Sequence, residues 1–261
     1  MRLEIAVQDV PGAQLAAAHG GARIELCCAL QLGGLTPSQG LLRSVREAEP
    51  TLPVHALIRP RPGGYVYDAT TVALMVAEIK AMHDGGATGV VIGALRPRGG
   101  IDYAAVETLV AAAEGLHITF HRAIDHLSMD DVVAAVPRLA SLGVRRILSS
   151  GGAVRAGDGI AQLQAMNETA NGTIAVMAGG GVEIADFASF HAAGLRDVHL
   201  SAKATVTTLP PAPLTASAQA SMVPAMTGTP AGMPVSAAAS AVISPATSPA
   251  HSSWGCWMPG A

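Results

Sequence analysis

The sequence predicts an α/β protein, a (β/α)8 TIM-like barrel, on two observations. Strand-like runs alternate with segments of helical spacing, and strands that alternate with helices build a parallel sheet. The runs also recur at a spacing that favours a closed barrel over an open doubly wound sheet. They lie near residues 2–7, 23–27, 54–58, 88–92, 117–121, 145–149, 173–177 and 197–201.

The segments between these runs carry helix signals. An apolar stripe at helical spacing ends at Gly85 and consists of Val72, Met75, Val76 and Ile79. Thr36 before Pro37 predicts an N-cap followed by a first-turn proline, and Ser128 with Asp131 resembles a capping box. No amphipathic helix follows the eighth run, so we expect the final helix of the barrel to be missing.

The composition changes at about residue 203. Every Asp, Glu, Lys and Arg lies at or before Lys203, and residues 204–261 consist mainly of Ala, Pro, Ser, Thr, Met and Gly. Such a segment buries too little apolar surface to offset the entropy lost on ordering. We therefore expect a barrel domain over residues 1–203 and a disordered tail over residues 204–261.

The composition also excludes several classes of protein. A net charge of −3 gives no electrostatic basis for binding nucleic acid. No uncharged apolar run reaches the roughly 18 residues of a membrane span, and the charges near the N-terminus argue against a signal peptide. Cys27, Cys28 and Cys256 form neither a disulfide framework nor a paired zinc motif, which fits a reducing cytoplasm.

One strand-like run is polar on a single face. In residues 117–121, Ile118 and Phe120 share one face, whereas the two histidines and Thr119 share the other. The same parity in other runs directs further polar side chains into the lumen: Glu4, Gln8, Arg23, Glu25, Cys27, His55, Arg59, His121, His199 and Ser201. A barrel lumen is normally filled by Val, Ile and Leu, so converging ionisable groups indicate a site. For any single residue, a structural hydrogen bond such as one between Glu25 and Arg59 is the alternative.

Two glycine-containing loops follow late strands. Gly151 and Gly152 come after the sixth run, and residues 179–181 come after the seventh. Backbone N–H groups of such loops can hold an anion or a phosphate. Tight turns that require positive φ are the alternative interpretation.

Taken together, these pieces resemble the copper homeostasis protein CutC family over about residues 2–203. The stretches that carry the resemblance are Arg23-Ile-Glu-Leu-Cys27, Gly33-Gly-Leu-Thr-Pro-Ser38, Ile58-Arg-Pro-Arg61, Thr119-Phe-His-Arg-Ala-Ile-Asp125, Leu148-Ser-Ser-Gly151, Met177-Ala-Gly-Gly-Gly-Val182 and His199-Leu-Ser-Ala202. The resemblance implies a TIM-like barrel, a cytoplasmic location, self-association into a homo-oligomer and a link to copper.

The chain departs from the family pattern in the third loop, in the sixth loop and after the eighth run. The third loop reads Arg59-Pro-Arg-Pro-Gly-Gly-Tyr65, without the acidic residue that usually follows the glycines. In the sixth loop, Ser149-Ser150 stands where Thr-Ser is common. The family continues with a polar loop and a closing helix, whereas residues 204–261 resemble nothing in it. A divergent extension and a shifted reading frame both remain open for this tail.

Copper(I) binding in or near the lumen is the function that the resemblance implies. Copper(I) prefers soft ligands, namely Cys or Met, with imidazole as a further donor. Cys27 lies on the lumen face by parity, and His121 is the expected second ligand. The alternative for Cys27 is a small buried apolar residue.

The competing hypothesis is a barrel enzyme, a lyase, isomerase or hydrolase that acts on a small anionic or phosphorylated molecule. Glu25 and His121 are the candidate general acid–base pair, and Asp125 either orients His121 or caps a turn. The candidate substrate-binding residues are Arg59, Arg61, Arg122, His199, Ser201, Gly151 and Gly180. A binding protein without chemistry fits the same lumen, and the fold does not choose among these classes.

Overall fold

The computed structural model describes residues 1–201. The chain divides into two units, Met1–Thr205 and Val206–Ala261, and the description below concerns the first. The predicted disorder of the tail and the predicted absence of a final helix concern residues outside the described range.

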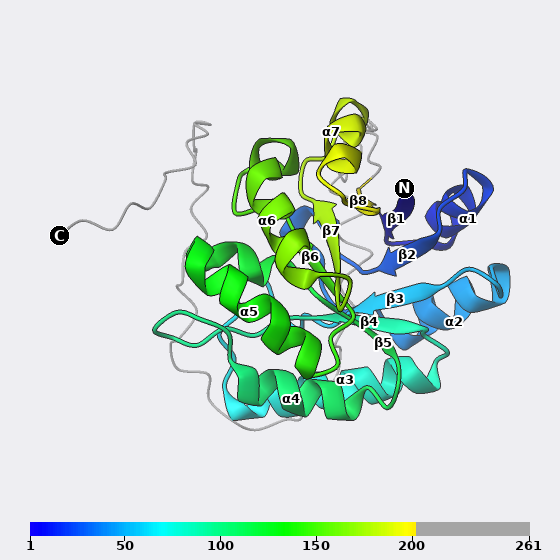
Figure 1. The fold of residues 1–261 in the computed structure, drawn as a ribbon. Coiled ribbons are helices and arrows are strands. Elements are labelled where there is room, and N and C mark those ends of the chain that lie inside the picture. The colour runs from blue at the N-terminus through cyan, green and yellow to red at the C-terminus, as the bar shows by residue number, and fades with distance from the viewer. Residues whose placement is uncertain (202–261) are drawn as a thin grey trace, which may run out of the picture. The chain divides into compact units, whose positions relative to one another are not determined.

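The predicted barrel is confirmed. Parallel strands form one closed barrel in the order β1 to β8 (Figure 1). The strands are β1 (Arg2–Val7), β2 (Arg23–Leu26), β3 (Val54–Leu57), β4 (Gly89–Ile92), β5 (His117–Phe120), β6 (Arg146–Ser149), β7 (Ala175–Gly179) and β8 (Asp197–Leu200). Each lies within two residues of the run that predicted it.

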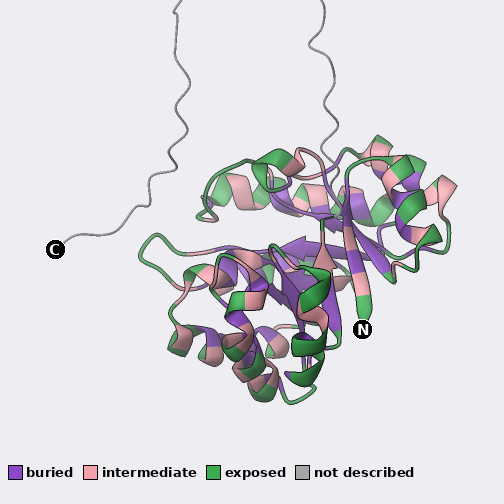
Figure 2. Ribbon diagram, turned by 90° about the horizontal axis from the view of Figure 1, so that it is seen from above, coloured by how far each residue is buried: buried purple, intermediate pink, exposed green. Residues whose placement is uncertain are grey.

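Helices connect the strands and surround the barrel. They are α1 (Val10–Ala18), α2 (Gln39–Ala48), α3 (Ala69–Asp84), α4 (Tyr103–Ala112), α5 (Met129–Ser141), α6 (Ile160–Ala170) and α7 (Phe187–Ala192), with short 3-10 turns η1 (Leu30–Leu32), η2 (Arg122–His126), η3 (Ala156–Gly159) and η4 (Ile184–Asp186). Figure 2 shows buried strands inside and helices with exposed outer faces around them. No helix of residues 1–201 is long and apolar enough to cross a membrane.

Side-chain caps start most of the longer helices. Ser128 caps α5 by accepting from the Asp131 N–H, as predicted, but Asp131 Oδ2 accepts from the Ser128 hydroxyl at 2.6 Å rather than from its backbone N–H, so only half of the predicted capping box forms. The N-cap predicted at Thr36 is wrong, because Ser38 caps α2 by accepting from the Leu41 N–H. The Thr36 hydroxyl instead donates to Glu78 and accepts from the Arg59 N–H.

The alternation along the strands separates two environments. The outward side chains form one apolar core beneath the helices, including Ile24, Leu26, Val54 and Phe120. The inward set contains buried charged residues, among them Glu4, Arg23 and Arg146. The polar lumen predicted from parity is therefore present.

The outer face of β1 is only partly covered by residues 1–201. Leu3 and Ile5 are half-buried, whereas Val198 of β8 is fully buried. A hollow of about 750 Å³ lies over β1 and α1, on the outside of the barrel, and its lining is mainly apolar. It contains no concentration of ionisable groups, so we place the chemistry elsewhere.

Candidate functional site in the barrel mouth

The carboxyl ends of the strands surround a cavity of about 580 Å³. Strands on different sides of the lumen contribute to it, since Glu25, Arg59, His121 and His199 all line it. The other predicted residues in the lining are Arg122, Asp125, Gly180 and Ser201. Arg61, Gly151 and Cys27 are not part of the lining, so the structure does not support a contact from them to a ligand in this cavity.

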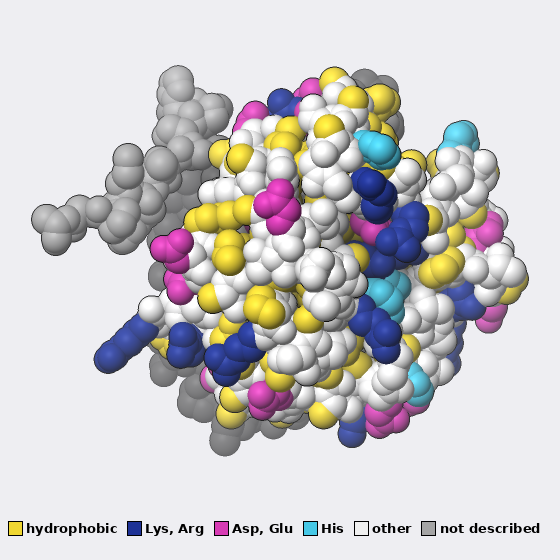
Figure 3. Space-filling view, in the orientation of Figure 1, with side chains coloured by type: hydrophobic (Ala, Val, Ile, Leu, Met, Phe, Trp, Pro, Cys, Tyr) yellow, Lys and Arg dark blue, Asp and Glu magenta, His cyan; other side chains and the backbone are white. Residues whose placement is uncertain are grey.

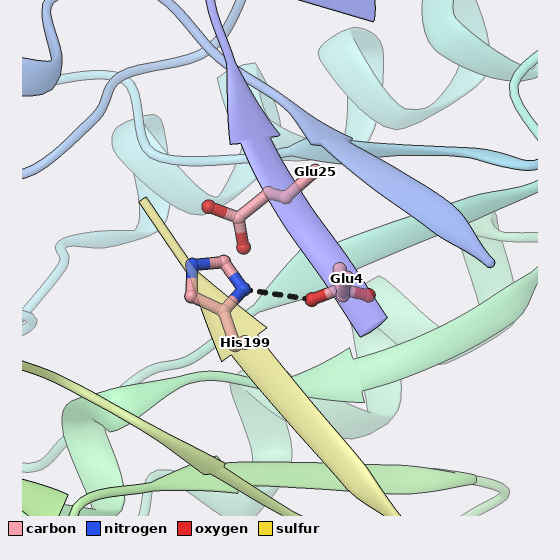
Figure 4. A group of neighbouring side chains, drawn as sticks. All are labelled: Glu4, Glu25 and His199. Atoms are coloured by element: carbon pink, nitrogen blue, oxygen red, sulfur yellow. Dashed lines mark hydrogen bonds and ion pairs between the residues drawn. The ribbon is translucent and has the colours of Figure 1, made fainter. Parts of the chain in front are cut away.

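The acid–base group of the cavity joins three strands (Figure 4). Glu4 on β1 is fully buried, and its Oε1 lies 2.9 Å from Nδ1 of His199 on β8. Glu25 on β2 directs its carboxyl group toward the same imidazole. One donor or acceptor atom of each residue lies within 4.8 Å of those of the other two. The His199 ring thus lies between two carboxyl groups.

Burial and neighbouring charges set the protonation of this group. Burial raises the pKa of Glu25 to about 7, although the charge of His199 opposes the shift. Burial alone would also raise the pKa of Glu4, but His199 and the Arg23 guanidinium hold it well below its usual range. Burial would lower the pKa of His199, but the charges of Glu25 and Glu4 raise it above its ordinary value. Near neutral pH, Glu4 is therefore ionised, Glu25 can exchange its proton, and the two carboxyl groups favour the protonated form of His199.

The imidazole of His121 is held in one orientation and one tautomer. Its Nδ1 accepts a hydrogen bond from the Ala123 N–H at 3.1 Å, and a Cβ at Gly93 would overlap the ring. Burial, reinforced by the charge of Arg59, lowers the pKa of His121 to about 3, so the ring is neutral at physiological pH. Since Nδ1 accepts, the proton of the neutral ring is on Nε2. The structure therefore does not support His121 as the acid–base partner of Glu25, and His199 occupies that place.

Arg59 and Arg61 organise the third loop. Arg59 Nη1 donates to the carbonyl oxygens of Leu32 and Gly34, and its Nη2 donates to that of Gly63. Arg61 donates to carbonyl oxygens of its own loop and lies 5.0 Å from the ring centroid of Tyr67. Of these two arginines, only Arg59 lines the cavity. Most of its N–H groups donate to loop carbonyl oxygens.

Asp125 holds the loop after β6. Its carboxylate accepts from the Ser149 hydroxyl at 2.5 Å, from the Ser150 N–H at 3.1 Å and from Arg122 Nε at 2.8 Å. These contacts support the turn-capping alternative for Asp125. The N–H of Gly151 donates to the Ser149 hydroxyl at 2.8 Å, and its φ of +69° supports the tight-turn alternative there.

Arg122 is the most accessible cation of the lining. Its side chain is 40% exposed, and Ser150 and Asp125 fix its guanidinium group. A Cβ at Gly180 would lie 2.8 Å from Arg122 Cζ. The missing side chain of Gly180 therefore lets the guanidinium group lie against the backbone of the loop after β7.

The predicted copper(I) ligands lie in different surroundings, because His121 lines the cavity and Cys27 does not. Cys27 packs with Leu57, Val91 and Leu30, and its Sγ lies 3.6 Å from the carbonyl oxygen of Val7. His121 uses its Nδ1 lone pair on the Ala123 N–H, so a metal at Nε2 would require an imidazolate. The Glu4, Glu25 and His199 donors suit harder ions than copper(I), and Glu4 is already neutralised by Arg23 and His199.

A charged floor lies beneath the cavity. Asp197 accepts from Arg2 Nη2 at 2.5 Å and from Arg23 Nη2 at 3.0 Å, and Arg146 Nε lies 3.8 Å away. Figure 3 shows Lys, Arg and His side chains gathered around an acidic one, at the place where Figure 1 labels the N-terminus and β8. Strand parity predicted that Glu4 and Arg23 face the lumen but gave them no role in the site. Tyr65, which lines the cavity from the third loop, has no repeating pattern that could have predicted its place.

A model of the CutC family matches residues 1–204. The chain belongs to the CutC family. The family protein CutC of Pectobacterium atrosepticum is 41% identical over 201 residues, which cover 77% of this chain and 78% of that protein. The CutC protein of Aliivibrio fischeri is 40% identical over 208 residues, covering 78% and 83%.

Solved structures agree with this assignment. A crystal structure of CutC from Streptococcus agalactiae, for which a copper-homeostasis role is suggested, superposes with a TM-score of 0.72 at 29% identity and covers 76% of this chain and 97% of that one. Deoxyribose phosphate aldolase from Aeropyrum pernix superposes with a TM-score of 0.60 at 15% identity, covering 77% and 85%. At that identity, the likeness concerns the fold alone.

Proposed function

We propose that this CutC family protein is an enzyme that transfers protons on a small anionic molecule bound in the barrel mouth. One observation carries the proposal: the Glu25 carboxyl group is 7% exposed, faces His199 and has a pKa of about 7. A general acid–base group works best when its pKa lies near the operating pH. A carboxyl group that served packing alone would more simply be replaced by an aliphatic side chain, as in most barrel lumens.

His199 and Glu4 support this role of Glu25. Glu4 keeps the imidazole protonated and fixes its position through the bond at Nδ1. A protonated imidazole beside Glu25 can donate a proton to the substrate after Glu25 has removed one. The environments of Glu4 and Glu25 push the pKa values of these two carboxyl groups apart, which is the usual arrangement when one carboxyl group stays charged and the other exchanges a proton.

The opposite part of the cavity is suited to an anion. Arg122 lies there against Gly180, and the loops that carry Gly152 and Gly181 line the same part of the cavity. The remaining wall is apolar and includes Leu30, Leu57, Leu148, Val154 and Val182. This wall limits the water around the reacting group, which strengthens its charge interactions.

A panel of small carboxylates and phosphate esters in D2O, followed by proton NMR, tests the proposal. The full-length chain is expected to convert at least one compound or to exchange one of its C–H protons. Glu25→Gln is expected to lower that rate roughly 10²- to 10⁴-fold, and the rate of the unmodified protein is expected to rise with pH through about 7. Glu107→Gln, on the exposed face of α4, is the matched control. A panel without turnover or exchange, or an equal rate in Glu25→Gln, contradicts the proposal.

Copper(I) binding is the second candidate, and the role suggested for the Streptococcus agalactiae relative supports it. His121 Nδ1 already accepts from the Ala123 N–H, so a copper(I) ion would have to bind at Nε2 of that ring, with Cys27 as the soft ligand. Titration of the reduced protein with copper(I) is expected to show equal loss of affinity in Cys27→Ser and His121→Ala, with the fold intact by circular dichroism. An unchanged affinity in both variants removes this candidate.

A further inference from the structure

Two buried N–H groups of the mouth cavity have no hydrogen-bond partner in the described part of the chain. They are Nε2 of His121 and Nε of Arg59. Both side chains are more than nine-tenths buried, with exposures of 5% and 6%. Buried polar atoms are almost always paired, and leaving one unpaired costs about 1–3 kcal/mol. Two such donors in one cavity therefore need a physical reason.

Both groups are donors in this structure. A guanidinium Nε always carries a proton. His121 is neutral with Nδ1 accepting from Ala123, so its Nε2 also carries one. The other buried orphan atoms of residues 1–201 belong to His55, Tyr67, Thr119 and Arg146, none of which lines the cavity.

Tyr65 connects the two donors. Its ring centroid lies 4.7 Å from that of His121 and 5.5 Å from Cζ of Arg59. The Tyr65 ring therefore lies beside both side chains, and all three residues line the cavity. The loop that carries Tyr65 is fixed by the carbonyl contacts of Arg59 and Arg61. The donors are held in place before any ligand binds, which is the condition for electrostatic catalysis.

We infer that Arg59 Nε and His121 Nε2 form an oxyanion-binding pair, and that the substrate is a small carbonyl compound with a carboxylate or phosphate group. This inference rests on the proposed function and names its substrate class. The Glu25 carboxylate removes a proton from the carbon next to the carbonyl group. The electron pair of that C–H bond forms a C=C bond, and the carbonyl π pair moves to oxygen, where the two N–H groups hold it.

The proton then returns from the Glu25 carboxyl group or from His199, and no oxidant or metal takes part. A neutral imidazole suits this role, because its N–H can stabilise an enolate without giving up its proton fully. Arg59 adds a positive charge beside the oxygen, where low solvent access makes it effective.

The test uses two enolate-mimicking probes, oxalate and 2-phosphoglycolate, titrated into the full-length chain by calorimetry. We expect at least one to bind, and we expect His121→Phe to weaken it roughly 10- to 100-fold, as for a lost hydrogen bond to a charged group. Binding of oxalate identifies a carboxylate substrate, and binding of 2-phosphoglycolate alone identifies a phosphorylated one. His83→Phe, at the exposed end of α3, is the matched control.

A second measurement needs no substitution at His121. Nitrogen-15 NMR of the histidine rings is expected to show Nε2 protonated at neutral pH and shifted when the probe binds. Failure of both probes to bind, equal affinity in His121→Phe, or protonation at Nδ1 overturns the inference. Glu25→Gln is expected to keep probe affinity while losing proton transfer. The inference therefore fails alone if only the His121 results fail. If Glu25→Gln retains catalysis, the proposed function fails and the enolate step fails with it, even if the probes still bind at His121.

Discussion

Glu4→Gln tests whether the buried carboxylate of β1 organises the lumen. Glu4 is paired with Arg23 Nε and lies 2.9 Å from His199 Nδ1. Glutamine has the same shape but no charge, and its amide NH2 group would face one of these two donors. Removing one partner of a buried ion pair costs roughly 3–5 kcal/mol. Because Arg23 retains Asp197 at 3.0 Å, we expect the lower end, a loss of about 3 kcal/mol.

Urea unfolding followed by circular dichroism measures this loss. A domain of ordinary stability has only about 5–15 kcal/mol in total, so the midpoint is expected to shift clearly. The same variant is expected to lower the pKa of His199, because Glu4 supplies both a hydrogen bond and a charge that raise it. Glu107→Gln is expected to change stability by less than about 0.5 kcal/mol. A Glu4→Gln variant within about 1 kcal/mol of the unmodified protein, with an unchanged His199 titration, would refute the reasoning.

Two further outcomes follow from the packing of the histidines. Gly93→Ala is expected to lower the free energy of unfolding by about 1–3 kcal/mol, because its Cβ would overlap the His121 ring. Gly40→Ala is the control, since its Cβ would lie 3.9 Å from the Ser38 hydroxyl, and it is expected to be neutral or mildly stabilising. Thermal unfolding measures both variants. Acidification from pH 6.5 to 4.5 is expected to destabilise the fold. The pKa values of His55, His117 and His121 are lowered from 6.5 to about 4, about 3 and about 3, so the unfolded chain binds about three more protons there. Glu25, with its pKa raised from 4.5 to about 7, opposes this by about one proton, and the raised pKa of His199 opposes it further, so the net effect of acidification remains a loss of stability. Urea unfolding that gives the same stability at both pH values contradicts this assignment.

The barrel and its polar lumen could be predicted because both depend on repeating patterns in the sequence. These patterns are the alternation of strands with helices and the two-residue repeat within each strand. A strand alternates every residue, so the parity of Glu25, His121 and His199 placed them inside the barrel. Parallel strands end at one face, which brought these side chains to a single cavity. Neither step requires knowledge of a loop.

The arginines and caps could not be predicted in the same way. Arg61 turns back onto carbonyl groups of its own loop, and Thr36 is engaged by Arg59 and Glu78, which are distant in sequence. Such contacts depend on loop conformations that have no repeating signal. The roles of Glu25, His199 and Cys27 depend on pairs formed across the barrel, and sequence parity gives the direction of a side chain but not its partner.

The charges of the lumen also have a consequence for how the chain finds its strand alignment. If β1 or β2 slipped by one residue against its neighbours, its inward and outward side chains would change places. Arg23 would then lie in the apolar layer beneath the helices, or Glu4 would leave its partners in the lumen, and aliphatic side chains would face the remaining ions. In a barrel with an aliphatic lumen, the same slip would only exchange apolar side chains that face the lumen for apolar side chains that face the helices. The ion pairs of this barrel therefore favour one strand register, because a barrel with a shifted register would be less stable even without a ligand.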